Sequence, residues 1–274
     1  MQITKVITSI NDNPTYRDFL PLASLVWKKL FNLRLTVGYV TTKEANDPEV
    51  INLSKYADIK IFPPISNIDG GVQAKVTRMY LASSAELVNE NCMIVDVDMI
   101  PLSSEVLEVF KDCPEDYLAK WGYDHPVFLN APHIGKWPMD RTTAKGKVFR
   151  EIINPQNLTY NNLIESWRGL HNYGKEDVNL PFGQFSDESL LRFLYENWVN
   201  KNTNTYKISR LKLEKKMLSR RLDRIYPQMW NNLKEKLNRK EFIELHGVRP
   251  LRPNLIYYKC VMDYFGITEK DILL

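Results

Sequence analysis

The chain has 274 residues, of which 44% are hydrophobic and 26% charged, and its formal net charge is +4. A chain of this size buries about three quarters of its unfolded surface, which excludes a disordered protein, a collagen-like repeat and a minimal disulfide-stapled module. No apolar run approaches the roughly 18–20 residues of a membrane span, and the first residues lack the layout of a signal peptide. The three cysteines are scattered and form no CxxC pair, which indicates free thiols in a reducing, cytoplasmic setting.

The first hundred residues alternate between strands and helices. Strands are predicted at residues 3–10, 33–40, 59–62 and 92–97, with helices at 15–31, 47–57 and 72–90 between them. Continuous apolar strands separated by helices predict an α/β fold with a mostly parallel sheet that helices cover on both faces. Because such sheets bind ligands at the carboxyl ends of their strands, we expect a site after Ser9, after Phe62 and around Asp96.

The pattern is less regular after residue 101. Helices are predicted at residues 103–111, 145–153, 158–168, 186–199 and 209–240, and a short strand, a turn and a last helix at 241–259. We interpret residues 1–200 as the α/β core and residues 201–274 as a basic, helical segment that returns to the site.

Positive charge is concentrated in that last segment. Residues 201–240 hold thirteen Lys or Arg against three acidic residues, so they carry +10 and the remainder of the chain −6. Phosphate groups, an anionic membrane or nucleic acid are possible partners, and a solvated helix surface is the alternative. The densest stretch, Arg220 to Arg224, would either bind such an anion or form a solvated helix face.

The strongest local signal is the segment IVDVDMIP, residues 94–101. In an extended backbone, side chains two residues apart point the same way, so Asp96 and Asp98 would face one cleft together. Two such carboxylates repel each other unless a cation lies near them. Their oxygen ligands suit Mg²⁺ or Mn²⁺, which proteins commonly bind together with substrate phosphates. The segment therefore predicts a metal–diphosphate site, with a structural turn as the alternative.

The extended segment IVDVDMIPLS resembles the DxD motif of GT-A glycosyltransferases, whose donors are nucleotide-diphospho-sugars. The strand ending in Ser9-Ile10-Asn11 resembles the segment that cradles the nucleotide base, and the helix GGVQAKVTRMYLAS resembles the one that precedes the DxD strand. The resemblance implies the GT-A fold, which is Rossmann-like with a mixed, mostly parallel sheet. It also implies donor contacts at Ser9, Asn11, Lys75, Arg78, Asp96 and Val97.

Two later segments extend the resemblance. The pair Asp187-Glu188 resembles the acidic pair beside the sugar and the acceptor, which makes these two the candidate catalytic residues. The segment LHGVRP, residues 245–250, is similar to the late histidine segment of glycosyltransferase family 8, although that family spaces its glycine and Lys-Pro-Trp differently. The resemblance implies His246 as a third metal ligand, with Gly247 and Arg249 at the diphosphate. An ordinary turn is the alternative.

Together these patterns predict a metal-dependent glycosyltransferase. It would move a sugar from a UDP- or GDP-sugar to a glycan or lipid-linked acceptor, with Mn²⁺ or Mg²⁺ on the diphosphate. If configuration inverts, Asp187 or Glu188 takes the acceptor proton, and if it is retained the pair only orients the sugar. Trp121, Tyr123 and Trp137 could stack on a sugar ring, although core packing is the simpler interpretation.

Two other functions compete with this one. A sugar-phosphate nucleotidyltransferase would carry a glycine-rich, basic loop after its first strand, where this chain has Asn11-Asp12-Asn13-Pro14. A non-enzymatic protein that binds a membrane or nucleic acid through residues 201–240 would not need the DxD segment. We expect no nucleic-acid partner, and we expect a cytoplasmic enzyme that contacts a membrane peripherally through residues 201–240.

Overall fold

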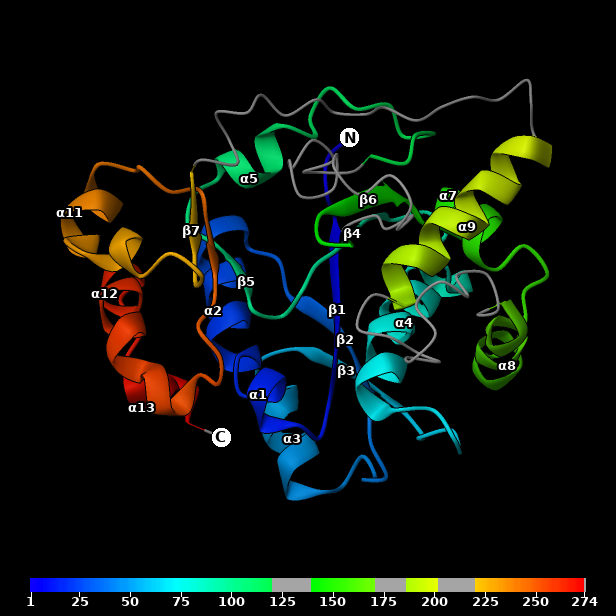
Figure 1. The fold of residues 1–274 in the computed structure, drawn as a ribbon, viewed down its shortest axis with the longest axis horizontal. Coiled ribbons are helices and arrows are strands. Elements are labelled where there is room, and N and C mark those ends of the chain that lie inside the picture. Colours follow the sequence, from blue (N-terminus) through cyan, green and yellow to red (C-terminus); the bar gives the residue numbers. More distant parts are fainter. Residues whose placement is uncertain (120–138, 171–185, 202–219, 274) are drawn as a thin grey trace.

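The computed structural model describes residues 1–119, 139–170, 186–201 and 220–273. Within them a five-stranded sheet lies at the centre of the molecule (Figure 1). Its strands are β1 (Lys5–Asn11), β2 (Leu35–Val40), β3 (Asp58–Phe62), β4 (Asn91–Ile94) and β6 (Thr142–Lys145). The order is β3-β2-β1-β4-β6, with the first four parallel and β6 antiparallel to β4. The carboxyl ends of the parallel strands therefore meet at one edge.

A second, three-stranded sheet joins parts of the chain that are far apart in sequence. It consists of β5 (Met99–Pro101), β8 (Glu244–His246) and β7 (Arg221–Asp223), in that order. β5 runs antiparallel to β8 and places Met99 opposite His246, while β7 runs parallel to β8 and places Asp223 opposite His246. The strand that follows the DxD segment is thereby hydrogen-bonded to the C-terminal part of the chain.

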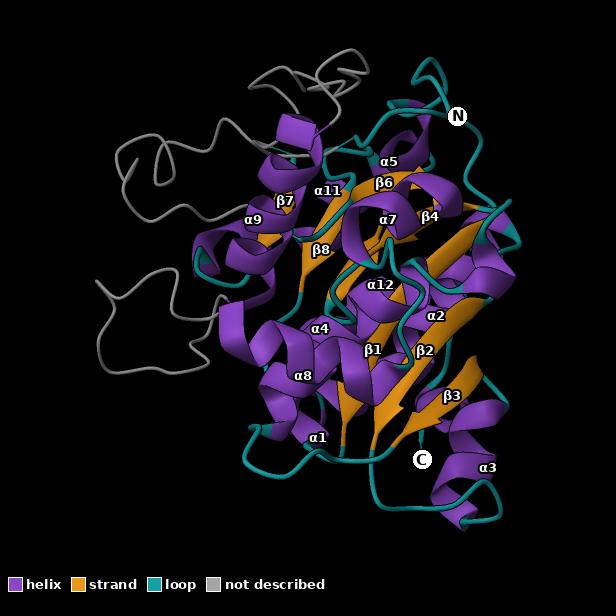
Figure 2. Cartoon of the chain, turned by 90° about the vertical axis from the view of Figure 1, so that its right-hand side faces the viewer, coloured by secondary structure: helices purple, strands orange, loops and turns teal. Residues whose placement is uncertain are grey.

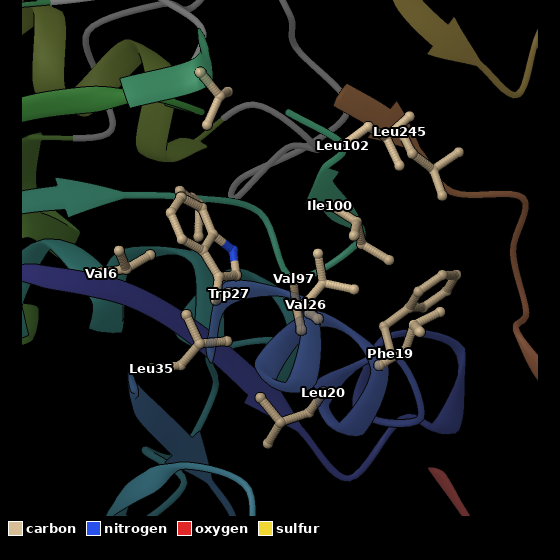
Figure 3. Packing of buried hydrophobic residues seen from close by; sticks show 14 of the residues in the cluster. Val6, Phe19, Leu20, Val26, Trp27, Leu35, Val97, Ile100, Leu102 and Leu245 are labelled. Carbon is tan, nitrogen blue, oxygen red and sulfur yellow. The ribbon is translucent and has the colours of Figure 1, made fainter. Parts of the chain in front are cut away.

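A first hydrophobic cluster lies between the central sheet, helix α2 (Leu20–Phe31) and the second sheet (Figure 3). Trp27 of α2 is fully buried beside Val6 and Leu35 of the central sheet. Ile100 and Leu245 bring β5 and β8 into the same cluster. Helices α12 (Leu255–Phe265) and α13 (Glu269–Ile272) also contribute to it. The C-terminal residues thus share a core with the first hundred.

Four helices cover the other face of the sheet (Figure 2). They are α4 (Gly70–Ala82), α7 (Gly146–Ile153), α8 (Tyr160–Leu170) and α9 (Ser186–Lys201). Successive side chains of a strand point to opposite faces, so Val6 of β1 belongs to the first cluster and Ile7 to the second. Cover on both faces explains why β2 and β4 are buried along their whole length.

Shorter elements connect these layers. They are the helices α1 (Pro14–Arg17), α3 (Pro48–Ser54), α5 (Glu105–Glu108) and α11 (Leu233–Asn238) and the 3-10 turns η1 (Ala85–Leu87), η2 (Pro227–Trp230) and η3 (Arg252–Asn254). The predicted α/β fold is confirmed, with its mostly parallel sheet and its helices on both faces. In the described part of the chain, no helix is long and apolar enough to cross a membrane.

Some predicted elements are wrong in extent or type. The helix expected at residues 72–90 already ends at Ala82, with a 3-10 turn after it, and the strand expected at residues 92–97 already ends at Ile94. The helix expected at residues 209–240 is not continuous in its described part, because residues 221–223 form β7 and 227–230 form a 3-10 turn. Leu222 is buried between the more exposed Arg221 and Asp223, and pairing with β8 decides the conformation. An alternation three residues long is too short to stand out within a basic run.

The close approach of α7 to the turn after η1 generates a test of the fold. A Cβ at Gly146 would lie 1.9 Å from the backbone oxygen of Leu87, and Gly146 N–H donates to Glu90 O at 2.8 Å. The atoms that a Cβ would meet belong to the backbone of Leu87 and cannot turn away as a side chain would. We therefore expect Gly146→Ala to lower the free energy of unfolding by about 3 kcal/mol in urea denaturation. In the control Gly70→Ala, the new Cβ would meet only Asn11 Nδ2 at 3.4 Å, so stability should change by less than about 1 kcal/mol. Equal stabilities of the two variants would contradict this packing.

Candidate active site

The DxD segment forms a turn at the carboxyl edge of the central sheet. Met99 N–H donates to Asp96 O at 3.0 Å, and Gly247 N–H donates to Asp98 O at 2.8 Å. The expectation of an extended backbone is therefore wrong, because the chain reverses here to leave β4 and enter the second sheet. The two carboxylates still interact, since the charge of Asp96 contributes to the shifted pKa of Asp98.

Arg78 of α4 holds the first carboxylate of the motif. Its side chain is buried, and its guanidinium donates to the Asp96 carboxylate, to Val95 O at 3.2 Å and to Asp187 Oδ2 at 2.5 Å. Burial alone would raise the pKa of Asp96, but the charge and hydrogen bond of Arg78, together with the charges of His246 and Lys75, outweigh burial and the pKa is lowered. Arg78 thus joins the motif to the first turn of α9. Its predicted contact with the nucleotide stays a prediction.

Asp98 is the more buried carboxylate, with a side chain 4% exposed. Its Oδ2 lies 2.8 Å from Arg224 Nη1, 3.3 Å from Arg249 Nε and 3.8 Å from His246 Nε2. Burial and then the charge of Asp96 raise the pKa of Asp98, while the three cationic or imidazole groups act in the opposite direction. One buried carboxylate therefore gathers three side chains from the C-terminal part of the chain.

His246 lies between two carboxylates. Its Nδ1 is 3.3 Å from Asp223 Oδ2, and its Nε2 faces Asp98. In a neutral imidazole whose Nδ1–H donates to Asp223, the Nε2 lone pair points at the Asp98 carboxylate, and the two repel unless a cation or proton lies between them. Metal-bound histidines commonly have such a carboxylate on the other ring nitrogen. The donor types at this place therefore fit a hard divalent cation.

The predicted ligand set comes together only in part. Asp98 faces His246, but both carboxylates of the motif already have arginine partners, Asp96 with Arg78 and Asp98 with Arg224 and Arg249. Within the described ranges, no three His, Cys, Asp or Glu side chains gather into a metal-binding group. The structure thus supplies two facing donors, Asp98 and His246, and a second carboxylate, Asp96, two residues before Asp98 along the turn.

Gly247 and Arg249 close the site from the C-terminal side. A Cβ on Gly247 would lie 2.6 Å from the Phe19 ring, so the glycine permits a close backbone approach. The Arg249 guanidinium lies over the Tyr16 ring, 4.8 Å from its centroid, and donates to the Tyr16 hydroxyl. Sequence reasoning missed Tyr16, because nothing in its local pattern shows that residue 249 would lie against it.

The other predicted donor contacts lie along β1 and α4. Ser9 donates to Ala74 O, which ties β1 to α4. Asn11 stands at the end of β1, where its side chain accepts from Asn13 N–H at 3.2 Å. Lys75 of α4 is partly exposed, whereas Val97 is buried, so only the backbone of Val97 is available to a ligand.

A polar network that sequence reasoning missed extends this edge beyond Asn11. Tyr39 Oη lies 2.6 Å from Asp12 Oδ1 and 2.5 Å from Glu49 Oε1. Lys43 Nζ donates to both of these carboxylates, at 2.9 and 2.8 Å. Burial raises the pKa of Tyr39, and the two neighbouring carboxylates raise it further. The network fixes the loops that follow β1 and β2.

A second missed feature is a buried ionic network beneath the DxD turn. Arg141 is fully buried over the Trp27 ring and donates to Glu244 Oε2 at 3.0 Å. Arg221 donates to the other oxygen of Glu244 at 2.5 Å. Asp140, next in line, accepts from Asp96 N–H at 3.3 Å. The network therefore holds the backbone of the turn in place through the hydrogen bond from Asp96 N–H to Asp140.

The basic stretch at residues 220–224 is neither a helix face nor a free patch. Arg220 pairs with Glu105, Arg221 with Glu244 and Arg224 with Asp98. Asp223, the one carboxylate of the stretch, faces His246. Each arginine of the stretch thus has a carboxylate partner within the molecule.

Some predicted residues cannot be placed. The proposed sugar platforms Trp121, Tyr123 and Trp137 lie outside the described residues. Asp187 and Glu188 are described at the start of α9, where Asp187 is buried and Glu188 partly exposed. The structure therefore brings Asp187 to the DxD turn through Arg78 and places Glu188 beside it in sequence.

Comparison of the whole structure with solved structures gives extensive matches at low identity. The galactosyltransferase LgtC, solved with donor and acceptor sugar analogues, matches with a TM-score of 0.52 and 13% identity over 97% of this chain and 98% of LgtC. The glycosyltransferase GlyE of Streptococcus pneumoniae matches with a TM-score of 0.50 and 12% identity over 99% of this chain and 62% of GlyE. No family model and no curated sequence matches the chain. The chain thus has the fold of the GT-A glycosyltransferases.

The position of Arg78 between two carboxylates generates a stability prediction. We expect Arg78→Met to lower the free energy of unfolding by about 3–5 kcal/mol, because it leaves Asp96 and Asp187 without their cation. In the control Arg192→Met, the lost partner is Glu196 on a partly exposed face of α9, and the cost should be about 0.5 kcal/mol. Both values come from chemical denaturation. Similar costs for the two variants would contradict the proposed clamp.

Asp140 generates a pH prediction. Burial raises its pKa to about 6 against the opposing charge of Arg141, with Glu244 and Asp96 raising it further. The folded state therefore holds this proton more tightly than the unfolded chain, so the contribution of Asp140 to stability falls as pH rises from about 4 to about 7. Asp140→Asn has no such proton. Its free energy of unfolding relative to the wild type should increase over that range by on the order of 2–3 kcal/mol. Urea denaturation with a chelator present measures it, and a pH-independent difference would refute the assignment.

Proposed function

We propose that this chain is a glycosyltransferase that moves a sugar from a nucleotide-diphospho-sugar to an acceptor hydroxyl. The observation that carries the proposal is the convergence of Asp98, His246, Arg224 and Arg249 at the carboxyl edge of the parallel sheet. Open α/β sheets bind their ligands at that edge, and a diphosphate is the ligand that suits facing carboxylates and arginines together. The GT-A fold and the DxD turn support the same activity.

Asp96, Asp98 and His246 would hold a divalent ion, Mn²⁺ or Mg²⁺. Such an ion supplies positive charge against the charge that develops on the leaving diphosphate. Arg224 and Arg249 would contact phosphate oxygens from the C-terminal side. Ser9 and Asn11 would lie along the nucleoside of a UDP- or GDP-sugar, and Lys75 would add positive charge at the start of α4.

The acidic pair of α9 would act on the sugar and the acceptor. Asp187 is bonded to Arg78, which suits a residue that orients its neighbours. Glu188 is then the candidate for accepting the proton of the attacking hydroxyl if the reaction inverts configuration. If configuration is retained, both residues orient the sugar. The acceptor class that we propose is a glycan or a lipid-linked glycan.

A contact with a membrane surface would suit a lipid-linked acceptor. We propose that it involves the described part of residues 201–240, where Ile225 and Tyr226 are 65% and 45% exposed. Lys234 and Lys240 are also exposed in this segment and could meet anionic headgroups. The enzyme that we propose is cytoplasmic and binds a membrane peripherally, and flotation with anionic vesicles tests this contact.

The turn after β1 favours transfer over synthesis of a nucleotide-sugar. Asn13 caps α1, and its side chain accepts from Thr15 N–H at 2.9 Å. That amide is therefore not offered to a triphosphate, as the amides of a glycine-rich loop would be. Released products separate the two reactions, because transfer or donor hydrolysis yields a nucleoside diphosphate and synthesis yields pyrophosphate.

We expect purified protein to hydrolyse or transfer from one of a set of UDP- and GDP-sugars in the presence of Mn²⁺ or Mg²⁺. Asp98→Asn should reduce that turnover by about 10²-fold or more, because it removes a ligand charge at the diphosphate. The control is Asp58→Asn. Asp58 pairs with Arg34 at the amino end of β3, at the opposite end of the strand from the candidate site, so this variant should retain turnover. Full activity in an Asp96→Asn/Asp98→Asn double variant, or release of pyrophosphate, would refute the proposed reaction.

A further inference from the structure

A pocket of about 410 Å³ lies away from the DxD turn, between α7 and the end of α9. It is lined by Lys147, Arg150, Glu151, Pro155 and Trp198. Asp187 opens α9 and Trp198 lies eleven residues later, so about 16 Å of helix separates the pocket from the candidate active site. The pocket is therefore a separate place on the surface, and its size is within the range of small-ligand sites.

The pocket is built on a rigid base. The inward residues of α7, among them Val148, Phe149 and Ile152, are buried in the second hydrophobic cluster. Helical periodicity then places Lys147 and Arg150 together on the outer side, three residues apart. Trp198 of α9 packs against the same cluster, and its ring centroid lies 6.0 Å from that of Tyr195. The Trp198 side chain is partly exposed.

The charges around the pocket are not balanced within it. Lys147 has a side chain 70% exposed, and its ion-pair distance to Glu151 is 4.0 Å. Arg150 is half-buried, and among the described residues no hydrogen bond or ion pair engages its guanidinium. A half-buried guanidinium loses part of its hydration and gains most from a carboxylate or phosphate that accepts two of its hydrogen bonds. The lining thus carries two cations against one carboxylate.

We propose that this pocket binds a sugar residue that bears an anionic group, a carboxylate or a phosphate. The partly exposed indole of Trp198 lines the pocket and offers an apolar surface to a sugar ring. Arg150 binds the anionic group through its planar fork, and Lys147 adds a second positive charge. A neutral sugar would contact Trp198 but would offer no charge to Arg150 and Lys147. An inorganic anion would meet the two cations but would have no ring to pack against Trp198. This inference does not depend on the proposed transfer reaction.

The test uses the full chain and follows amide chemical shifts during titration with glucuronic acid, glucose 1-phosphate and glucose. At least one charged sugar should bind saturably in the millimolar range, and glucose should bind about 10-fold more weakly or not at all. Preference for the carboxylate or for the phosphate identifies which anionic sugar the pocket takes. Arg150→Gln and Lys147→Gln should each weaken binding, Arg150→Gln by about 10-fold, and neither replaces a buried residue.

The matched control is Arg192→Gln, which removes the same charge from α9, where Arg192 pairs with Glu196. Equal weakening by Arg150→Gln and Arg192→Gln would show only general electrostatic attraction and would overturn the proposal. So would inorganic phosphate binding as tightly as glucose 1-phosphate, or an absence of binding by both charged sugars. Asp98→Asn should retain binding here, and Arg150→Gln should retain nucleotide-sugar turnover. Failure of this site and failure of the proposed reaction are therefore distinguishable.

Discussion

Ion pairs between carboxylates and arginines hold the candidate site together. Asp96 faces Arg78, and Asp98 faces Arg224 and Arg249. Removing a charged group from water costs several kcal/mol, and a buried pair offsets this cost only while both partners remain in place. The buried Asp98 therefore depends on the docking of the C-terminal segment, and docking of α4 adds a cation beside the more exposed Asp96. The carboxylates and arginines that suit a metal ion and a diphosphate therefore also hold distant parts of the chain together.

Strand pairing and apolar burial bring the C-terminal segment to these carboxylates. β8 pairs with β5 directly after the DxD turn, so His246 is placed opposite Met99 by backbone hydrogen bonds. Leu245, on the neighbouring position, is buried in the first hydrophobic cluster. Apolar burial thus supplies the energy that brings the segment back, and the polar side chains of residues 246–249 take their places as a consequence. A site assembled in this way forms only after the long-range contacts of the core.

The sequence was sufficient for features with local signals. Apolar strands between helices predicted the parallel sheet, and the two aspartates after β4 predicted the edge at which acidic groups gather. Partners distant in sequence could not be predicted, because no periodicity links Arg141 to Glu244 or Arg249 to Tyr16. The run at 220–224 shows the limit most clearly, since its charge suggested a solvated helix while its three arginines each pair inside the molecule.

The first turn of α9 shows how one charge can serve both stability and the site. Asp187 lies at the N-terminal end of the helix, where the helix dipole favours a negative charge, and it is buried against Arg78. Arg78 in turn binds Asp96, so the carboxylate of α9 and that of the DxD turn share one cation. Any movement of α9 would change the position of Asp96 through this arginine. Because α4, α7 and α9 also pack together in the second hydrophobic cluster, the helix is held along its length and the spacing between its two ends is fixed. The geometry of the DxD turn therefore depends on the packing of a helix layer that reaches the turn through Arg78.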